Sequence, residues 1–281
     1  MSRKNIFDLL ERDYNIAEEA DRIDTLFSHE ELTFDYKGSR FSKTVEKFFD
    51  KYLFLEWEHS NTFLNVSEYR EHLGINNELV ISRSLNFDEC LRYFEYVFNV
   101  VFQVLCSCIT DKIILNRIKR NIELVLAHFN YKIHSDDKNR KFIIIENNPA
   151  ATSVAEIVED DNISRDIIRY NHFILKGNLY EKKKILTQLY KEYEKIEKVL
   201  KKNNHKSLAD DLGFIFNALG IRHDKSDNKV TNQLVADMQE TKLEEWCDRV
   251  YDTFLLAELT VNNINEKNKI DWLKTGEPKR D

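Results

Sequence analysis

The sequence predicts a mainly α-helical protein, and two observations carry this prediction. Only six glycines and two prolines punctuate the 281 residues, too few for the many tight turns of a β-sandwich or barrel. Apolar residues also recur at steps of three and four over long stretches, which is the period of a helix that buries one face. At 42% apolar and 32% charged residues, the chain has the composition of a globular protein with a substantial core.

The first half is aromatic-rich and reads as helices. Ser42 is an expected cap for a helix over residues 43–58, and residues 66–73 read as a short amphipathic helix. Asn86 is the expected cap of a helix over residues 87–109. Because apolar residues fill both of its faces, this helix should be central. A further helix is expected over residues 111–129.

The period then changes near the middle of the chain. The stretch YKIHSDDKNRKFIIIEN has a polar tip before a short apolar run, residues 142–145, and this pattern indicates a small β-hairpin. We therefore expect a helical N-terminal region over residues 1–146 that ends in the hairpin, with no role assigned to it, and an antiparallel helical bundle over residues 147–281.

The second half contains strong helix signals. Asn147 or Asn148 is an expected cap with Pro149 in the first turn, and Gly177 is expected to end the helical stretch that follows. Residues 179–203 form a narrow apolar stripe beside a charged face with eight Lys and four Glu. That charge could face RNA phosphates, but a solvated face explains it better, with Glu-to-Lys pairs four residues apart at Glu194 and Lys198 and at Glu197 and Lys201.

Two more helices and a tail complete the bundle. A capping box at Ser207 and Asp210 should begin a helix that Gly220 ends, and residues 241–261 form the last strong helix. The polar tail from Asn263 is expected to fray.

Several classes of chemistry find no support. The four cysteines (Cys90, Cys106, Cys108 and Cys247) read as reduced core thiols. The carboxylates of Glu156, Glu159, Asp160 and Asp161 are better explained as helix caps, with Asp161 or Asn162 capping, than as metal ligands. The sequence has no phosphate-cradling glycine loop, and its histidines lack metal-ligand spacing. We expect no metal and no cofactor.

The net charge and the N-terminus bear on location and partners. The formal charge is −7, so the surface as a whole does not favour nucleic acid, although a local basic patch still could. The apolar runs are shorter than the roughly 18–20 residues that cross a bilayer, and the N-terminus lacks a secretory signal. These features predict a cytoplasmic protein without a membrane partner.

The stretch GIRHDKSDN, Gly220 to Asn228, separates the last two helices and is called the polar joint below. A polar loop in water is the simplest interpretation. However, Arg222 and His223 together suit phosphodiester cleavage, which needs a cation on the phosphate oxygens and a group that moves a proton. Arginine supplies the first and histidine the second near neutral pH.

The segment LGFIFNALGIRHDKSDN, with HFILKGNLYEKKKILTQL before it and LEEWCDRVYDTFLLAEL after it, resembles the HEPN superfamily of helical-bundle ribonucleases. Within that superfamily it is most similar to abortive-infection phage-resistance proteins of the AbiJ type. The resemblance covers about residues 148–261. It implies metal-independent RNA cleavage at the interface of a homodimer, and growth arrest or death of the infected cell.

The family motif has an Arg, a polar residue and, after four to six positions, a His. Arg222 and His223 match its first two places, but residues 227–229 contain no histidine. Asn228 stands in that region and cannot accept a proton at neutral pH. If cleavage occurs, His223, Asp224 or Asp227 must move the proton. The alternative is a non-catalytic module that binds RNA, a nucleotide or a phage protein, and an antitoxin is another conceivable partner.

Overall fold

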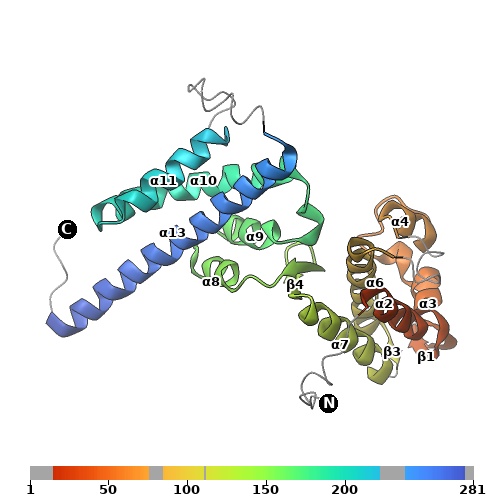
Figure 1. The fold of residues 1–281 in the computed structure, drawn as a ribbon. Coiled ribbons are helices and arrows are strands. Elements are labelled where there is room, and N and C mark those ends of the chain that lie inside the picture. Colours follow the sequence, from red (N-terminus) through yellow and green to blue (C-terminus); the bar gives the residue numbers. More distant parts are fainter. Residues whose placement is uncertain (1–14, 76–84, 111, 222–237, 276–281) are drawn as a thin grey trace, which may run out of the picture. The chain divides into compact units, whose positions relative to one another are not determined.

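The computed structural model describes residues 15–75, 85–110, 112–221 and 238–275 of the chain (Figure 1). Ten α-helices lie within these residues and make up most of them. The prediction of a mainly α-helical protein is therefore confirmed. The chain divides into two compact units, Met1–Glu146 and Asn147–Asp281.

Helix α6, Phe87–Ser107, is the centre of the first unit, as its apolar pattern predicted. Asn86 caps it through a capping box with Glu89, in which each side chain accepts a hydrogen bond from the other residue's backbone N–H. Ten of its side chains are buried on several faces. Four elements pack against it: α2 (Ile16–Asp24), α3 (Val45–Tyr52), α7 (Lys112–His128) and strand β5.

A three-stranded antiparallel sheet in the first unit was not predicted. Its strands are β1 (Glu31–Tyr36), β2 (Ser39–Thr44) and β3 (Ile109–Thr110), in the order β2-β1-β3. Lys37 and Gly38 form the two-residue turn between β1 and β2, and both have positive φ. The expected cap at Ser42 is wrong, because Ser42 lies in β2 and the Thr44 hydroxyl caps α3.

Helix α3 is also shorter than the helix expected over residues 43–58. It ends at Tyr52 and is followed by a short 3-10 turn, Phe54–Glu56, and then by α4, Val66–His72, which confirms the expected short helix. Bulky residues crowd this segment, and aromatic contacts such as Phe49 with Trp57 favour a turn over a continued helix.

The predicted β-hairpin is present as β4 (Tyr131–Asp136) and β5 (Lys141–Glu146). Side chains of α6 complete the backbone hydrogen bonding of β5. The Asn99 amide donates to the Phe142 carbonyl and accepts from its N–H, both at 2.8 Å, and Glu95 accepts from the Ile144 N–H at 2.7 Å. The hairpin thus belongs to the first unit, and its edge is covered.

The second unit is a helical bundle. Its core brings together apolar side chains of α8 (Pro149–Ile157), α9 (Asp161–Tyr170), α10 (Leu179–Lys202), α11 (Lys206–Ala218) and α13 (Glu240–Thr275). Asn148 caps α8 with Pro149 in its first turn, as predicted. Helix α10 packs against α9, α11 and α13, and Figure 1 shows α13 running along the bundle.

Three helix boundaries differ from the predictions. Asp160, and not Asp161 or Asn162, caps α9. This helix ends at Tyr170, before a 3-10 turn, Phe173–Leu175, that precedes Gly177. His205 is the N-cap residue of α11, so Ser207 lies inside the helix and its hydroxyl bonds the Asp211 side chain at 3.3 Å. The two N-terminal caps were thus shifted by one or two residues, which is the usual ambiguity of helix ends, whereas α9 ends seven residues before Gly177.

The tail and two cysteines were also predicted wrongly. Helix α13 continues to Thr275, with Ile270 and Leu273 on its exposed surface. All four cysteines are free, but only Cys90 and Cys247 are buried, whereas Cys106 is exposed and Cys108 half-buried. Burial raises the pKa of the Cys90 thiol to about 12.

Candidate functional site

The residues proposed from the sequence for the site, Arg222, His223, Asp224, Asp227 and Asn228, lie outside the described residues, which stop at Ile221 and resume at position 238. The structure does describe both helices that flank the polar joint. The end of α11 and the start of α13 therefore define where this stretch leaves and re-enters the bundle.

Helix α11 ends in a Schellman motif. The Gly220 N–H donates to the Asn217 carbonyl and the Ile221 N–H donates to the Phe216 carbonyl, each at 3.0 Å. Gly220 has φ of +67°, a conformation that glycine adopts without strain. Ile221 is buried in the core of the bundle beside Phe216 and Leu219. The sequence prediction that Gly220 ends the helix is confirmed, and the chain reaches Arg222 directly from a buried, hydrogen-bonded residue.

The start of α13 lies beside the start of α10. Glu244, in the second turn of α13, accepts hydrogen bonds from the Gly177 N–H and from the Lys182 ammonium, both at 2.7 Å. On the α11 side, the Phe216 ring packs against Tyr190, midway along α10, with centroids 5.1 Å apart. The end of α11 therefore lies beside the middle of α10, and α13 begins beside the first turn of α10.

A buried lysine organises this end. Lys182 is 6% exposed, and its ammonium lies 2.7 Å from Glu244 Oε1 and 2.7 Å from Asp248 Oδ1. The Tyr170 hydroxyl donates to the same Asp248 oxygen at 2.9 Å, and the ammonium lies 5.3 Å from the Tyr170 ring centroid. We call Lys182, Glu244, Asp248 and Tyr170 the Lys182 cluster. It joins α9, α10 and α13.

The pKa values in the cluster follow from burial and pairing. Burial opposes the charge of Lys182, but the hydrogen bonds to Asp248 and Glu244 outweigh it and raise the lysine pKa. Burial likewise opposes the charge of Glu244, and the hydrogen bonds from Lys182 and the Gly177 N–H lower its pKa in net terms. Both groups are thus stabilised in their charged forms. A fully paired lysine of this kind orients helices and is a poor general base.

A second polar pair lies directly behind the cluster. Tyr251 stacks on Tyr170 with centroids 4.0 Å apart, and its hydroxyl donates to the Ile167 carbonyl at 2.7 Å. The Asn171 amide donates to the Tyr251 hydroxyl at 2.6 Å. These bonds satisfy the buried polar groups, so this layer supports the packing of α9 against α13.

Exposed cations and an aromatic ring surround the start of α10. Tyr180 is 76% exposed, and Lys176 is exposed while Lys183 is half-buried. Neither lysine makes an ion pair with a residue that the structure describes. Exposed lysines can contact phosphates, and a free aromatic face can stack on a base. We call Lys176, Tyr180 and Lys183 the basic edge.

The remaining charged face of α10 is a solvated helix surface. Lys201 pairs with Glu197 at 2.7 Å and with Asp210 at 3.1 Å, and Lys195 pairs with Glu192. The predicted pair of Glu197 and Lys201 is therefore confirmed. Each such exposed pair contributes little to stability.

The acidic stretch before α9 acts as a helix cap. Asp160 accepts from the Asn162 N–H at 2.9 Å and from the Ile163 N–H at 3.4 Å, and these bonds lower its pKa. Among the described side chains, no group of three or more histidines, cysteines or carboxylates could hold a metal ion. In the same residues, no helix is long and apolar enough to cross a membrane.

Comparison with known proteins does not identify the chain, since no family model, no curated protein and no solved structure matches it. The structural features that sequence reasoning missed are Lys182 and Glu258. Each is a charged residue within the apolar stripe of a helix, one on α10 and one on α13. A charged residue inside an apolar stripe is the sequence feature from which both buried groups could have been predicted.

Proposed function

We propose that the second unit acts on RNA as an abortive-infection effector of phage defence, of the HEPN type. The observation that carries the proposal is the position of Arg222 and His223 in the chain. They follow a Schellman-capped helix end whose last described residue, Ile221, is buried and hydrogen-bonded. Ile221 is therefore a fixed anchor for Arg222 and His223, which follow it directly in the sequence.

The chemistry assigns a role to each residue of the joint. The Arg222 guanidinium binds phosphate oxygens in bidentate form and stabilises the charge that develops on them. His223 takes the proton from the ribose 2′-hydroxyl, with Asp224 or Asp227 as the alternative proton acceptor. Asn228 hydrogen-bonds a phosphate or ribose oxygen. Attack of the 2′-oxygen on the phosphorus breaks the bond from phosphorus to the 5′-oxygen of the next nucleotide. That oxygen takes up the proton carried by His223 and leaves as a 5′-hydroxyl, and the other product ends in a 2′,3′-cyclic phosphate, without a metal or cofactor.

The basic edge supports an RNA partner in a chain of net charge −7. Lys176 and Lys183 lie around the start of α10, beside the start of α13, and Tyr180 offers an exposed ring for stacking. Under this proposal the protein works in the cytoplasm as a homodimer, in which two joints and two basic edges share one cleft. A phage protein or the loss of an antitoxin would trigger it.

A second candidate function is binding without cleavage. The observation that favours it is Asn228, which stands where the family motif has its second histidine and cannot accept a proton. In this case the bundle binds RNA, a nucleotide or a phage protein, and protection follows from sequestration or signalling.

The experiment compares the wild type with Arg222→Ala, His223→Ala and a matched control in the same joint, Ser226→Ala. The purified full chain is incubated with total cellular RNA, and RNA ends are sequenced for 2′,3′-cyclic phosphates. Phage plaque counts are measured in parallel, and circular dichroism checks folding. The proposal expects cyclic ends and protection for the wild type and Ser226→Ala, and loss of both for the other two variants.

The outcomes separate the two candidates. RNA binding with no cyclic ends from the wild type supports the non-catalytic function. Full protection by both Arg222→Ala and His223→Ala would remove the joint from either mechanism.

A further inference from the structure

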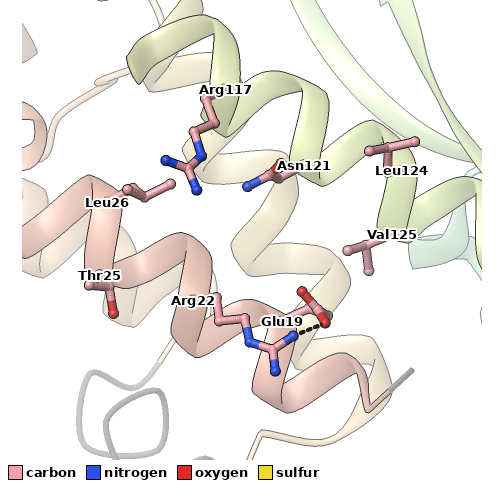
Figure 2. Close-up of a pocket in the computed structure, with 8 residues that line it drawn as sticks. All are labelled: Glu19, Arg22, Thr25, Leu26, Arg117, Asn121, Leu124 and Val125. Carbon is pink, nitrogen blue, oxygen red and sulfur yellow. Dashed lines mark hydrogen bonds and ion pairs between the residues drawn. The ribbon is translucent and has the colours of Figure 1, made fainter. Parts of the chain in front are cut away.

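A groove of about 450 Å³ lies in the first unit, between α7 and the segment formed by α2 and the turn after it (Figure 2). Its volume is within the range of roughly 300–1,000 Å³ typical of small-molecule sites. Eight residues line it: Glu19, Arg22, Thr25, Leu26, Arg117, Asn121, Leu124 and Val125.

The two arginines of the groove differ in their pairing. Arg22 forms ion pairs with Glu19 and with Glu18. By contrast, the Arg117 guanidinium makes no hydrogen bond or ion pair with a described residue, and the same holds for the Asn121 amide. Figure 2 shows both side chains extending from α7 toward α2. Among the described residues, the groove therefore presents one cation without an ion-pair partner beside an amide without a hydrogen-bond partner.

Three apolar side chains also line the groove. Leu26 faces Arg117 across the groove, and Leu124 and Val125 follow Asn121 along α7 (Figure 2). Leu124 is 53% exposed although it lies on a helix whose other leucines are buried or better covered. A ligand that fits must combine an anionic group with a flat or apolar body.

The wall that carries Thr25 and Leu26 has an unusual backbone. Residues Thr25–His29 form a π-helical turn, closed by a hydrogen bond from the Glu30 N–H to the Thr25 carbonyl at 3.2 Å. Such turns are rare and occur frequently at functional sites, because the wider turn displaces side chains from the helical register. Here it brings Leu26 to the rim of the groove.

We propose that this groove binds a nucleoside 5′-monophosphate. The Arg117 guanidinium takes the phosphate in bidentate form, which suits its planar donors. The base lies against the exposed side chain of Leu124, and Asn121, which can both donate and accept, bonds the base edge or the ribose. This binding site is in the first unit and does not depend on the activity proposed for the second.

The test is isothermal titration of the full-length protein with AMP, with adenosine and with inorganic phosphate. Arg117→Ala is expected to weaken AMP binding by roughly tenfold or more, because a hydrogen bond to a charged group is lost. Arg120→Ala is the matched control: it removes an exposed arginine of the same helix that does not line the groove, and AMP affinity should not change. Leu124→Glu tests the site independently by adding a negative charge beside the ligand.

The proposal predicts tighter binding of AMP than of adenosine or phosphate, sensitive to Arg117 and Leu124 but not to Arg120. Thermal unfolding of each variant, followed by circular dichroism, checks that the variants fold. The proposal fails if AMP does not bind at millimolar concentration, or if Arg117→Ala and Arg120→Ala weaken it equally. It also fails if inorganic phosphate binds as tightly as AMP, which would indicate an adventitious anion site only.

Discussion

The Lys182 ammonium of α10 lies 2.7 Å from the Glu244 carboxylate of α13, and both side chains are largely buried. The pair connects the first turn of α10 with the second turn of α13, and its two residues lie 62 positions apart in the sequence.

The first prediction concerns this pair. Lys182→Met keeps the length of the side chain but leaves the Glu244 carboxylate without its cation, so the variant should lose about 2–4 kcal/mol of unfolding free energy. Urea unfolding measures the loss. The control is Lys184→Met, whose ammonium is exposed and lies 3.5 Å from Glu181. It should change stability by less than about 1 kcal/mol. Equal stability of the two variants would show that the cluster does not support the bundle.

The second prediction uses the contact between Gly213 of α11 and Tyr193 of α10. A Cβ at Gly213 would lie 2.9 Å from the Tyr193 hydroxyl oxygen. That oxygen cannot easily move, because the hydroxyl donates to the Ala209 carbonyl at 2.6 Å. Gly213→Ala should therefore destabilise the protein by about 1–3 kcal/mol through overpacking, despite the better helix propensity of alanine.

Removing the hydroxyl should reverse the sign of this effect. In the Tyr193→Phe background, Gly213→Ala meets no oxygen and should stabilise the protein by about 1 kcal/mol, which is the propensity gain alone. A double-mutant cycle by urea unfolding measures the coupling. Additive effects of the two substitutions would contradict the contact.

The third prediction concerns the pH dependence of stability. Glu258 of α13 is 6% exposed, and its Oε1 has no hydrogen-bond partner in the part of the chain that the structure describes. Burial raises the pKa of Glu258 to about 7, and the neighbouring Glu192 adds to the shift while Lys195 opposes it. The unfolded chain releases this proton near the ordinary glutamate pKa of 4.5. The folded state thus binds more protons than the unfolded state between these two values, and stability falls as pH rises through this window.

Glu258→Gln removes this loss. The variant should have the same unfolding free energy as the wild type near pH 4.5. Above pH 7 its unfolding free energy should be higher by about 3 kcal/mol, because each unit of difference between the folded and unfolded pKa is worth about 1.4 kcal/mol. Urea unfolding at pH 4.5, 6 and 8 measures the difference. The control is Glu245→Gln, an exposed carboxylate on the same helix, which should show no such divergence. A constant difference between Glu258→Gln and wild type at all pH values would contradict the raised pKa.

The confirmed predictions share a physical origin. The capping box of Asn86, the cap at Asn148 with Pro149, and the glycine end of α11 each depend on residues within four or five positions of one another. Such local interactions can be read directly from a sequence. The β1–β2 hairpin was missed although its turn is also local, because Lys37 adopts a positive φ that its residue type does not suggest.

The sequence by itself determined the helical class, the mid-chain hairpin, most helix positions and the polar joint. Only the tertiary structure decided the partners of Lys182 and Glu258 and the groove beside Arg117. These features depend on which side chains face one another across helices far apart in the chain. Helical periodicity specifies the buried face of each helix, but the register between two packed helices arises only when the whole core is assembled.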